Sequence, residues 1–311
     1  MPVPIGVAAA GDRSAREIAS HSRAALDRPL AHPAEVWVAV ARDEALVLGA
    51  FQRGAGMPSS MPLLRRASGG PEVLVGAGTV YVALALAHPA ALEPSDARKI
   101  VNRSVRPLLR ALTKSGTLAH FFGRDWVSVA HRPAAWVGFA HDATSGRTLF
   151  EAFVAVRAPF ATAERASLLG KAPGTLEEIA GRPVDPMRVA AAVLEAYGAK
   201  GEARPMPTPA GPAPLAEEDL RADPPWLATA DEAIGTIGAG PDARGALRIG
   251  GDLLVSRDAL ARLESRLQGV PDEDVGEIVD ETLAAPGVAL DGVRSLTTVR
   301  DVTLRARAAM R

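Results

Sequence analysis

Short apolar runs and helical patterns follow one another through residues 1–200. Apolar side chains at three- and four-residue steps predict amphipathic helices over 11–27 and 95–112, with Pro29 and Gly116 ending them. A further helix is predicted over 188–199. Continuous apolar runs predict buried strands at 35–41, 45–51, 71–86, 126–130, 135–142 and 148–156.

Polar and glycine residues between these runs predict turns. Residues 42–44 predict a hairpin turn between the first two strands, and Ser145 with Gly146 predicts one between the last two. Gly76 and Gly78 divide the run at 71–86 into two strands.

The pattern changes after residue 200. Residues 201–225 are rich in proline and alanine and have no period, which predicts a linker. Residues 226–311 then predict a smaller unit, with strand, turn and strand over 246–256. Helices are predicted there over 258–269, 272–287 and 299–309. We therefore expect a domain at 1–200, a linker at 201–225 and an accessory domain at 226–311.

The length, charge and cysteine content of the chain exclude several classes of function. A chain of 311 residues is long enough for two domains, and a formal net charge of −1 gives no bulk attraction to nucleic acid or an anionic membrane. The chain has no cysteine, which excludes a disulfide scaffold, a thiolate metal site and a cysteine nucleophile. Neither a signal-peptide pattern nor a bilayer-length apolar run is present, so we expect a cytoplasmic protein.

Residues 65–79, RRASGGPEVLVGAGT, are the most informative stretch. Arg65 and Arg66 carry planar guanidinium groups that pair with carboxylate or phosphate, and Ser68 adds a hydroxyl. The glycines let the backbone approach a bound group and direct N–H donors at it. One interpretation is a pair of ordinary turns, and the other is a loop that holds an anionic ligand. The stretch is not a P-loop, because no Gly-Lys-Ser/Thr follows.

Other polar side chains flank the later strands. Asp125 precedes a strand, where it either holds a ribose, an adenine amine or a metal-bound phosphate, or caps local N–H groups. His131, His141 and Asp142 have no familiar metal spacing. Glu151 interrupts an apolar run, and we expect it to face outward, with a carboxylate turned into a pocket as the alternative. No Gly-x-Ser-x-Gly supports serine-hydrolase chemistry.

The order of these segments resembles the lipoate–protein ligase A, biotin ligase and octanoyltransferase superfamily. The resemblance rests on RRASGGPEVLVGAGTVYVALAL, the helix after it, GRDWVSV and AWVGFAHDATSGRTLFEAFVAV. ALRIGGDLLVSRDALARLESRLQG also resembles the small accessory domain of lipoate ligases. The resemblance implies an α/β (α+β) fold like that of biotin and lipoate ligases. Such a fold has a mixed, largely antiparallel sheet packed with helices, plus a small C-terminal α/β domain.

The resemblance also implies a set of ligand-binding residues. In the family, an Arg-Arg-x-Ser-Gly-Gly-Gly block, a loop ending Gly-Asn, a Gly-Arg-Asn-Asp segment and a Lys-x-x-Gly-x-Ala segment border a lipoyl- or biotinyl-adenylate. The positions that match are Arg65, Arg66, Ser68, Gly69, Gly70, Gly78, Asp125, Gly138 and Ala140. Gly76 belongs to the same loop, and Thr79 stands where the family has asparagine.

Several positions depart from the family. Pro71 replaces a glycine and removes an N–H. Ala135 stands where the family has the lysine that holds the acyl carboxylate and phosphate, an electrostatic role that alanine cannot fill. His131 and Arg132 are the nearest cations. The histidine of the family's His-Gly-Thr strand is replaced within residues 150–153.

Two functions are open from the sequence. The first is a divergent lipoate–protein ligase-like protein that binds a lipoyl, octanoyl or biotinyl adenylate-type ligand, with adenylation and transfer lost or altered. The second is an active ligase that attaches lipoate or octanoate to a carrier-domain lysine, with ATP and Mg²⁺ and a replacement cation. Arg132 or His131 at the lysine position would favour the active ligase. A hole beside Ala135 filled by Trp136 or Phe139 would favour binding alone.

The partners follow from the same resemblance. Lipoate, octanoate or biotin is the expected ligand, and a lipoyl or biotinyl carrier domain is the expected protein partner. Neither nucleic acid nor a membrane is expected, no metal-ligating residues are assigned, and the catalytic residues are left open.

Overall fold

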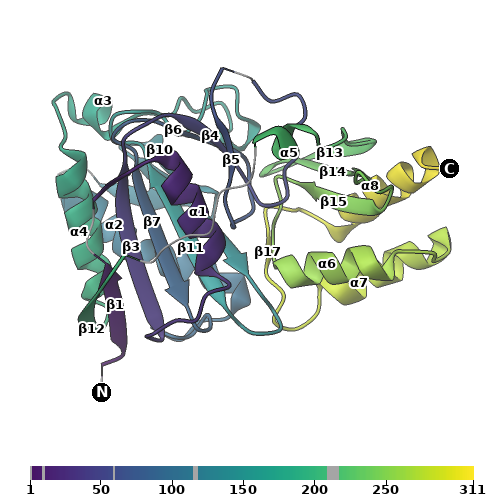
Figure 1. Ribbon diagram of the computed structural model, residues 1–311, viewed down its shortest axis with the longest axis horizontal. Coiled ribbons are helices and arrows are strands. Elements are labelled where there is room, and N and C mark those ends of the chain that lie inside the picture. The colour runs from purple at the N-terminus through teal and green to yellow at the C-terminus, as the bar shows by residue number, and fades with distance from the viewer. Residues whose placement is uncertain (1, 9–10, 59, 115–117, 209–216) are drawn as a thin grey trace.

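The computed structural model describes residues 2–8, 11–58, 60–114, 118–208 and 217–311. Within them, a nine-stranded sheet runs through the larger part of the molecule (Figure 1). Its strands follow in the order β12 (Glu202–Met206), β1 (Pro4–Ala8), β3 (Ala34–Ala41), β7 (Val80–Leu86), β11 (Thr148–Val154), β10 (Arg132–His141), β9 (Trp126–Val129) and β8 (Ala119–Phe121). β2 (Asp12–Arg13) pairs with the end of β3.

The sheet is mixed and largely antiparallel. β1 pairs in parallel with both β12 and β3, and every neighbour from β3 to β8 pairs antiparallel. In the central register, Val82 of β7 lies beside Val38 of β3 and Ala152 of β11. The predicted fold class is therefore confirmed.

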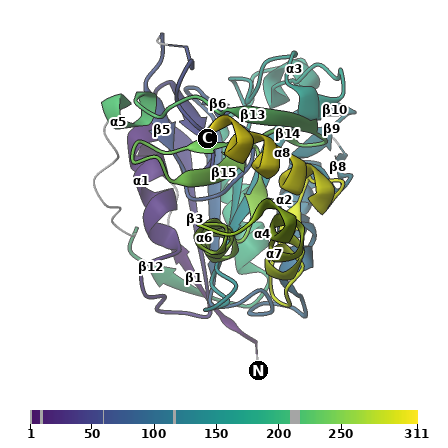
Figure 2. The same ribbon diagram turned by 90° about the vertical axis from the view of Figure 1, so that its right-hand side faces the viewer.

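Helices cover both faces of the large sheet (Figure 2). α2 (Ile100–Lys114) and α4 (Pro186–Gly198) bury one hydrophobic cluster against one face. α1 (Ala15–Ala25) lies on the other face, where its Ile18 joins a second cluster with Tyr81. Because successive strand side chains point to opposite faces, a sheet covered on both sides needs continuous apolar runs like those in the sequence.

A small second sheet packs on the α1 face. It consists of β5 (Leu63–Arg65), β4 (Ala45–Leu48) and β6 (Val73–Val75), with β4 in the centre. Val47, Leu64 and Val73 join the same hydrophobic cluster as α1. The loop from β5 to β6 contains the Arg-Ser-Gly-Gly residues, so this small sheet fixes where that loop lies.

The C-terminal part has a hydrophobic cluster of its own. Its elements are β13 (Ala228–Glu232), β14 (Gly235–Pro241), β15 (Leu247–Gly251), β16 (Leu254–Val255), α6 (Arg257–Arg266), α7 (Val275–Leu283), β17 (Leu290–Asp291) and α8 (Leu296–Ala309). β13 to β15 form an antiparallel sheet, and β16 pairs with β17. This unit lies next to the larger part, where β16 and α6 contact β10 (Figure 1).

The predicted hairpin over 35–51 is wrong. β3 and β4 both form, but β3 joins the large sheet and β4 the small one. The halves of 71–86, β6 and β7, separate in the same way, and so do β15 and β16 in 246–256. An apolar run signals burial equally well in any sheet, so the pattern alone does not select the partner strand.

The segment predicted as a linker takes part in the fold at both ends. Its first residues form β12, an edge strand parallel to β1, and α5 (Glu217–Arg221) packs Leu220 against Leu48 and Leu63. Positions 209–216 and Gly116, the predicted helix stop, lie outside the described residues. α3 (Leu176–Ala180) and the 3-10 turns η1 (Ala97–Lys99), η2 (Ala166–Leu168) and η3 (Asp272–Asp274) complete the described elements. None of the described helices has the length and apolarity to cross a membrane.

Candidate functional site

The Arg-Ser-Gly-Gly loop meets β10 and β11 at the centre of the α1 face. We call residues 66–70 together with Gly138 the glycine cradle. Ser68 N donates to Glu151 Oε2 at 3.1 Å, and Gly69 N donates to Phe139 O at 3.2 Å. Gly70 has a φ of 86°, which favours glycine. The loop is therefore tied to the two strands by its own backbone donors.

Arg66 is fully enclosed by this loop, with 1% of its surface exposed. Its Nε donates to Ser68 Oγ at 3.0 Å and its Nη1 to Val47 O at 2.9 Å. Its Nη2 donates to Gly69 O at 2.7 Å and to Pro71 O at 2.8 Å. Burial lowers the pKa of Arg66 to about 9. Four of the donors that guanidinium carries are thus used inside the protein.

Trp136 fills the space that the glycines leave. Its ring lies under the Arg66 guanidinium, with 4.0 Å between the Arg66 carbon and the ring centroid. A Cβ on Gly138 would come within 2.4 Å of the Trp136 ring, and one on Gly70 within 3.2 Å. The indole is fully buried. These two glycines are needed because an aromatic ring packs directly on their backbone.

The C-terminal unit closes the cradle from the other side. Gly70 N donates to Leu253 O at 2.7 Å, and a Cβ on Gly69 would lie 2.0 Å from the same oxygen. The Leu254 side chain lies 3.5 Å from the Cβ position of Gly70 and 3.2 Å from that of Gly138. A backbone N–H that could face an anion is therefore paired with the chain's own carbonyl group.

Glu151 faces inward, which corrects the expectation that it faces outward. It is fully buried and accepts hydrogen bonds from Ser68 N and from the Tyr81 hydroxyl. Burial and the Glu151 charge raise the pKa of Tyr81 well above its usual value. The positive charge of Arg66 opposes this buried carboxylate. The apolar run that contains Glu151 gave no sign of these partners.

The two cations expected as replacements for the family's lysine, Arg132 and His131, lie away from the cradle. Ala135 is fully buried in the cluster under α2 and α4, together with Phe139, on the opposite face of β10 from Trp136. Arg132 donates to Pro173 O at 2.8 Å and to Glu178 at 3.0 Å beside α3. His131 is exposed in the β9–β10 turn. Neither side chain comes to the cradle.

The remaining predicted residues separate into four places. Gly76, Gly78 and Thr79 form a turn, in which Gly76 N donates to Thr79 Oγ1 and Gly78 packs on Arg157. Arg65 donates to Ala50 O at 3.0 Å and to Asp223 at 3.1 Å, away from the cradle. Ala140 is buried in the α1-face cluster, and Asp125 lines a pocket at the unit boundary.

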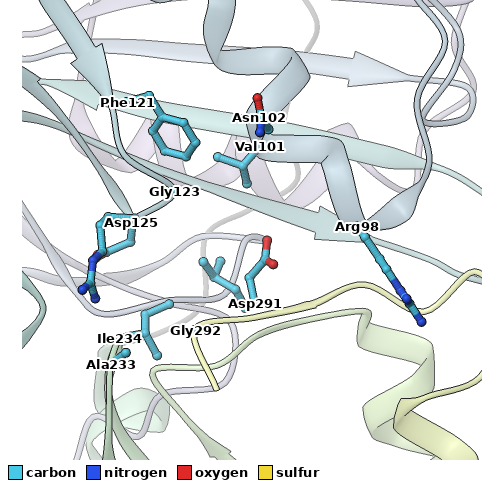
Figure 3. Close-up of a pocket in the computed structure, with 12 residues that line it drawn as sticks. Arg98, Val101, Asn102, Phe121, Gly123, Asp125, Ala233, Ile234, Asp291 and Gly292 are labelled. Atoms are coloured by element: carbon cyan, nitrogen blue, oxygen red, sulfur yellow. The ribbon is translucent and has the colours of Figure 1, made fainter. Parts of the chain in front are cut away.

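That pocket has a volume of about 220 Å³ and lies between the two units (Figure 3). Its polar lining residues are Arg98, Asn102, Arg124, Asp125 and Asp291, and its apolar ones include Val101, Phe121, Ile234 and Leu254. Figure 3 shows Val101 and Asn102 on one side, Ile234 and Gly292 on the other, and Asp291 between them. Leu254 borders both this pocket and the cradle, so the two lie next to each other.

One buried carboxyl (Asp125), one half-buried carboxyl (Asp291) and two arginines determine the charge of this pocket. Burial raises the pKa of Asp291 to about 6, and no hydrogen bond from a described residue reaches its carboxylate. Burial also raises the pKa of Asp125, whose carboxylate accepts from Ser167 Oγ at 3.2 Å. Asp125 was identified from the sequence, but Arg98, Asn102 and Asp291 were not. Arg98 and Asn102 lie within five residues at the start of the α2 region, and Asp291 comes from the C-terminal unit, far along the chain.

A second pair of carboxylates, both partly buried, joins the units. Gln52 Nε2 donates to Glu72 at 2.8 Å and to Asp252 at 2.7 Å, and Thr236 N donates to Asp252 at 2.7 Å. Burial and the nearby Glu72 charge raise the pKa of Asp252 to about 7. In the part of the chain that the structure describes, no group of three or more His, Asp or Glu side chains could hold a metal ion.

Asp252 makes the stability of the fold depend on pH. Its pKa rises on folding from 3.8 to about 7, so the folded state keeps a proton that the unfolded state loses between these values. We expect unfolding free energy to fall by about 2 to 4 kcal/mol between pH 5 and pH 8 relative to Asp252→Asn, which cannot ionise. Urea titrations of both chains across this range measure the difference.

Asp242→Asn is the control for that series. Hydrogen bonds from Arg244 N and Ala246 N lower the pKa of Asp242, so its carboxylate stabilises the fold above its unfolded pKa. The Asp242 variant should therefore lose stability relative to the parent at neutral pH. Parallel pH curves for the parent and Asp252→Asn would contradict the assignment.

The fold is that of the lipoate–protein ligases. The chain is similar to P. falciparum LipL1 in complex with lipoate, with a TM-score of 0.65 and 11% identity over 96% of this chain and 99% of that one. It is also similar to the bipartite lipoate protein ligase from Thermoplasma acidophilum, with a TM-score of 0.51 and 12% identity over 71% and 91% of the two chains. A lipoate-protein ligase A bound with ATP matches with a TM-score of 0.50 and 12% identity over 71% and 93%.

At these identities the likeness is one of fold. No protein-family model matches the sequence, and no curated protein matches it.

Proposed function

We propose that this protein binds an acyl ligand of the lipoyl or octanoyl type without activating it as an adenylate. The observation that carries the proposal is the filled cradle, where Trp136 and Leu254 occupy the space beside Gly70 and Gly138. An acyl phosphate there would have to displace a buried indole and the hydrogen bond from Gly70 N to Leu253 O. The residues present therefore do not fit an acyl-adenylate in the cradle.

The surroundings of Ala135 support the same proposal. Activation of a carboxylate places developing charge beside a cation, and the cation must face that charge to stabilise it. Ala135 faces the apolar cluster under α2 and α4, and Arg132 is held by Pro173 and Glu178. Ala135 therefore points away from the cradle, and neither Arg132 nor the exposed His131 supplies a cation there in its place.

The pocket between the units is the site we assign to the ligand. Arg98 and Arg124 suit a carboxylate, and Val101, Phe121 and Leu254 suit an alkyl chain. Asp291 repels a bound anion electrostatically only when it is ionised. Its pKa of about 6 means that this repulsion weakens below that pH. Binding should therefore be tighter at pH 5.5 than at pH 7.5.

The test combines binding and transfer on one preparation. Lipoate is titrated into the protein by calorimetry, and an apo lipoyl domain is then incubated with the protein, ATP, Mg²⁺ and lipoate and weighed by intact mass spectrometry. Octanoate and biotin are run alongside. We expect measurable heat of binding and no mass gain, because the filled cradle leaves no site for the adenylate. Ala135→Lys should also give no mass gain, since Trp136 still fills the cradle.

Two results would overturn the proposal. A mass gain with the unaltered chain would mean that the protein is an active ligase with another cation. If lipoate does not bind, the assignment of an acyl ligand to the pocket between the units is wrong. Arg98→Ala should weaken binding roughly three- to tenfold through loss of one ion pair, whereas Arg106→Ala, on the exposed side of α2, should leave it unchanged.

A further inference from the structure

A mostly apolar pocket lies in the helical layer, on the face of the large sheet opposite the cradle. It forms where the end of α2 meets α3 and the beginning of α4, and its volume is about 370 Å³. Its apolar lining includes Leu112, Val129, Leu176, Ile179, Val184 and Val189. A concave, apolar site with a few polar groups at its edge, in this volume range, is typical of small-molecule binding sites.

The polar groups around this pocket are predominantly cationic. Lys114, Arg182 and Arg188 line it, with Asp185 as the one carboxylate among the described lining residues. Asp185 already accepts from Met187 N at 3.0 Å as the cap of α4, and Arg188 lies 3.8 Å from it. Lys114 lies 3.6 Å from Glu195 on the exposed surface. The pocket edge therefore has an excess of positive charge over an apolar floor.

Arg182 is the least engaged of these cations. It is exposed in the loop between α3 and α4, and no hydrogen bond or ion pair joins its guanidinium to another residue in the described part of the chain. A guanidinium presents a planar fork of donors that matches a carboxylate. An anionic group at the pocket edge could pair with the Arg182 guanidinium without breaking an existing contact.

We propose that this pocket binds a free aliphatic carboxylate, with its alkyl chain on the apolar floor and its carboxylate at Arg182. A cationic amphiphile does not fit, because Lys114, Arg182 and Arg188 would repel its head group. Each further methylene that enters the floor should tighten binding about fourfold. The site is separated from the cradle by the sheet, so the proposal holds whether or not the cradle binds a ligand.

The test uses decanoate as the probe and the whole chain as the target. Decanoate is titrated by calorimetry, and methyl NMR follows Ile179 and Val184 in this pocket and Leu254 at the unit boundary. We expect shifts at Ile179 and Val184, and affinity about fifteenfold higher than that for octanoate, which has two fewer methylenes. Arg182→Glu should weaken decanoate roughly tenfold or more, because attraction becomes repulsion. Ala192→Leu, which fills the pocket, should also weaken it.

Controls separate this site from general effects. Arg106→Glu makes the same charge change on the exposed side of α2, outside the pocket, and should leave decanoate affinity unchanged. Decyltrimethylammonium, with the same chain and a positive head, should not bind. Methyl shifts confined to Leu254, equal binding of the cationic probe, or unchanged affinity in Arg182→Glu would each overturn the proposal. Lipoate should shift the Leu254 methyl signal equally in the parent and in Arg182→Glu, so this site-specific readout lets the two proposals fail separately.

Discussion

Arg66→Met should lower the free energy of unfolding by about 3 to 5 kcal/mol, because it removes a buried cation with four internal hydrogen bonds. The substitution leaves the carbonyls of Val47, Gly69 and Pro71 without this donor. It also leaves the buried Glu151 carboxylate without its opposing charge. Urea unfolding followed by circular dichroism measures the loss.

Arg65→Met is the matched control, since the two arginines are neighbours in the same motif. The Arg65 side chain is 18% exposed and pairs with Asp223, which is also partly exposed. Its loss should cost about 1 kcal/mol. Equal costs for the two variants would contradict a structural role for Arg66. If Arg66→Met keeps the stability of the parent but loses lipoate binding, Arg66 contacts the ligand rather than stabilising the fold.

Trp136→Ala should also destabilise the fold by about 3 to 5 kcal/mol, because it leaves a cavity between the cradle and the C-terminal unit. The indole packs on Arg66, Gly70 and Gly138, and these groups cannot close in without moving the loop. The cavity would open the space in which the resemblance expects a ligand. Urea unfolding gives the cost, and calorimetric titration of the variant with octanoate tests the opened space.

Trp226→Ala is the matched control for this substitution. Trp226 is half-buried and stacks under Arg53, with 3.6 Å between the Arg53 carbon and its ring centroid. Its loss should cost about 1 to 2 kcal/mol. A cost for Trp136→Ala no larger than this would mean that the surrounding residues move into the space of the indole and leave no cavity.

Local patterns in the sequence were enough to predict many of the elements. Continuous apolar runs located β3, β7, β10 and β11, and three- and four-residue steps located α2. These signals depend on neighbours a few residues away, so they can be read without knowing the partner segments. The arginine–glycine loop was identified as the unusual stretch, and the resemblance of its order with GRDWVSV to that of lipoate and biotin ligases, not a local pattern, implied the fold.

The outcome at the cradle depended on contacts between distant segments. The same glycines serve an open loop or a packed one, and only the approach of Trp136 and Leu253 decides between them. Glu151 was misassigned for the same reason, since its partners Ser68 and Tyr81 come from other strands and loops. The pocket beside Asp291 likewise needs both units. Local patterns were enough to show where the chain is apolar, where it turns and which loop is glycine-rich. What fills that loop followed only from the folded chain, because packing joins residues that no local pattern relates.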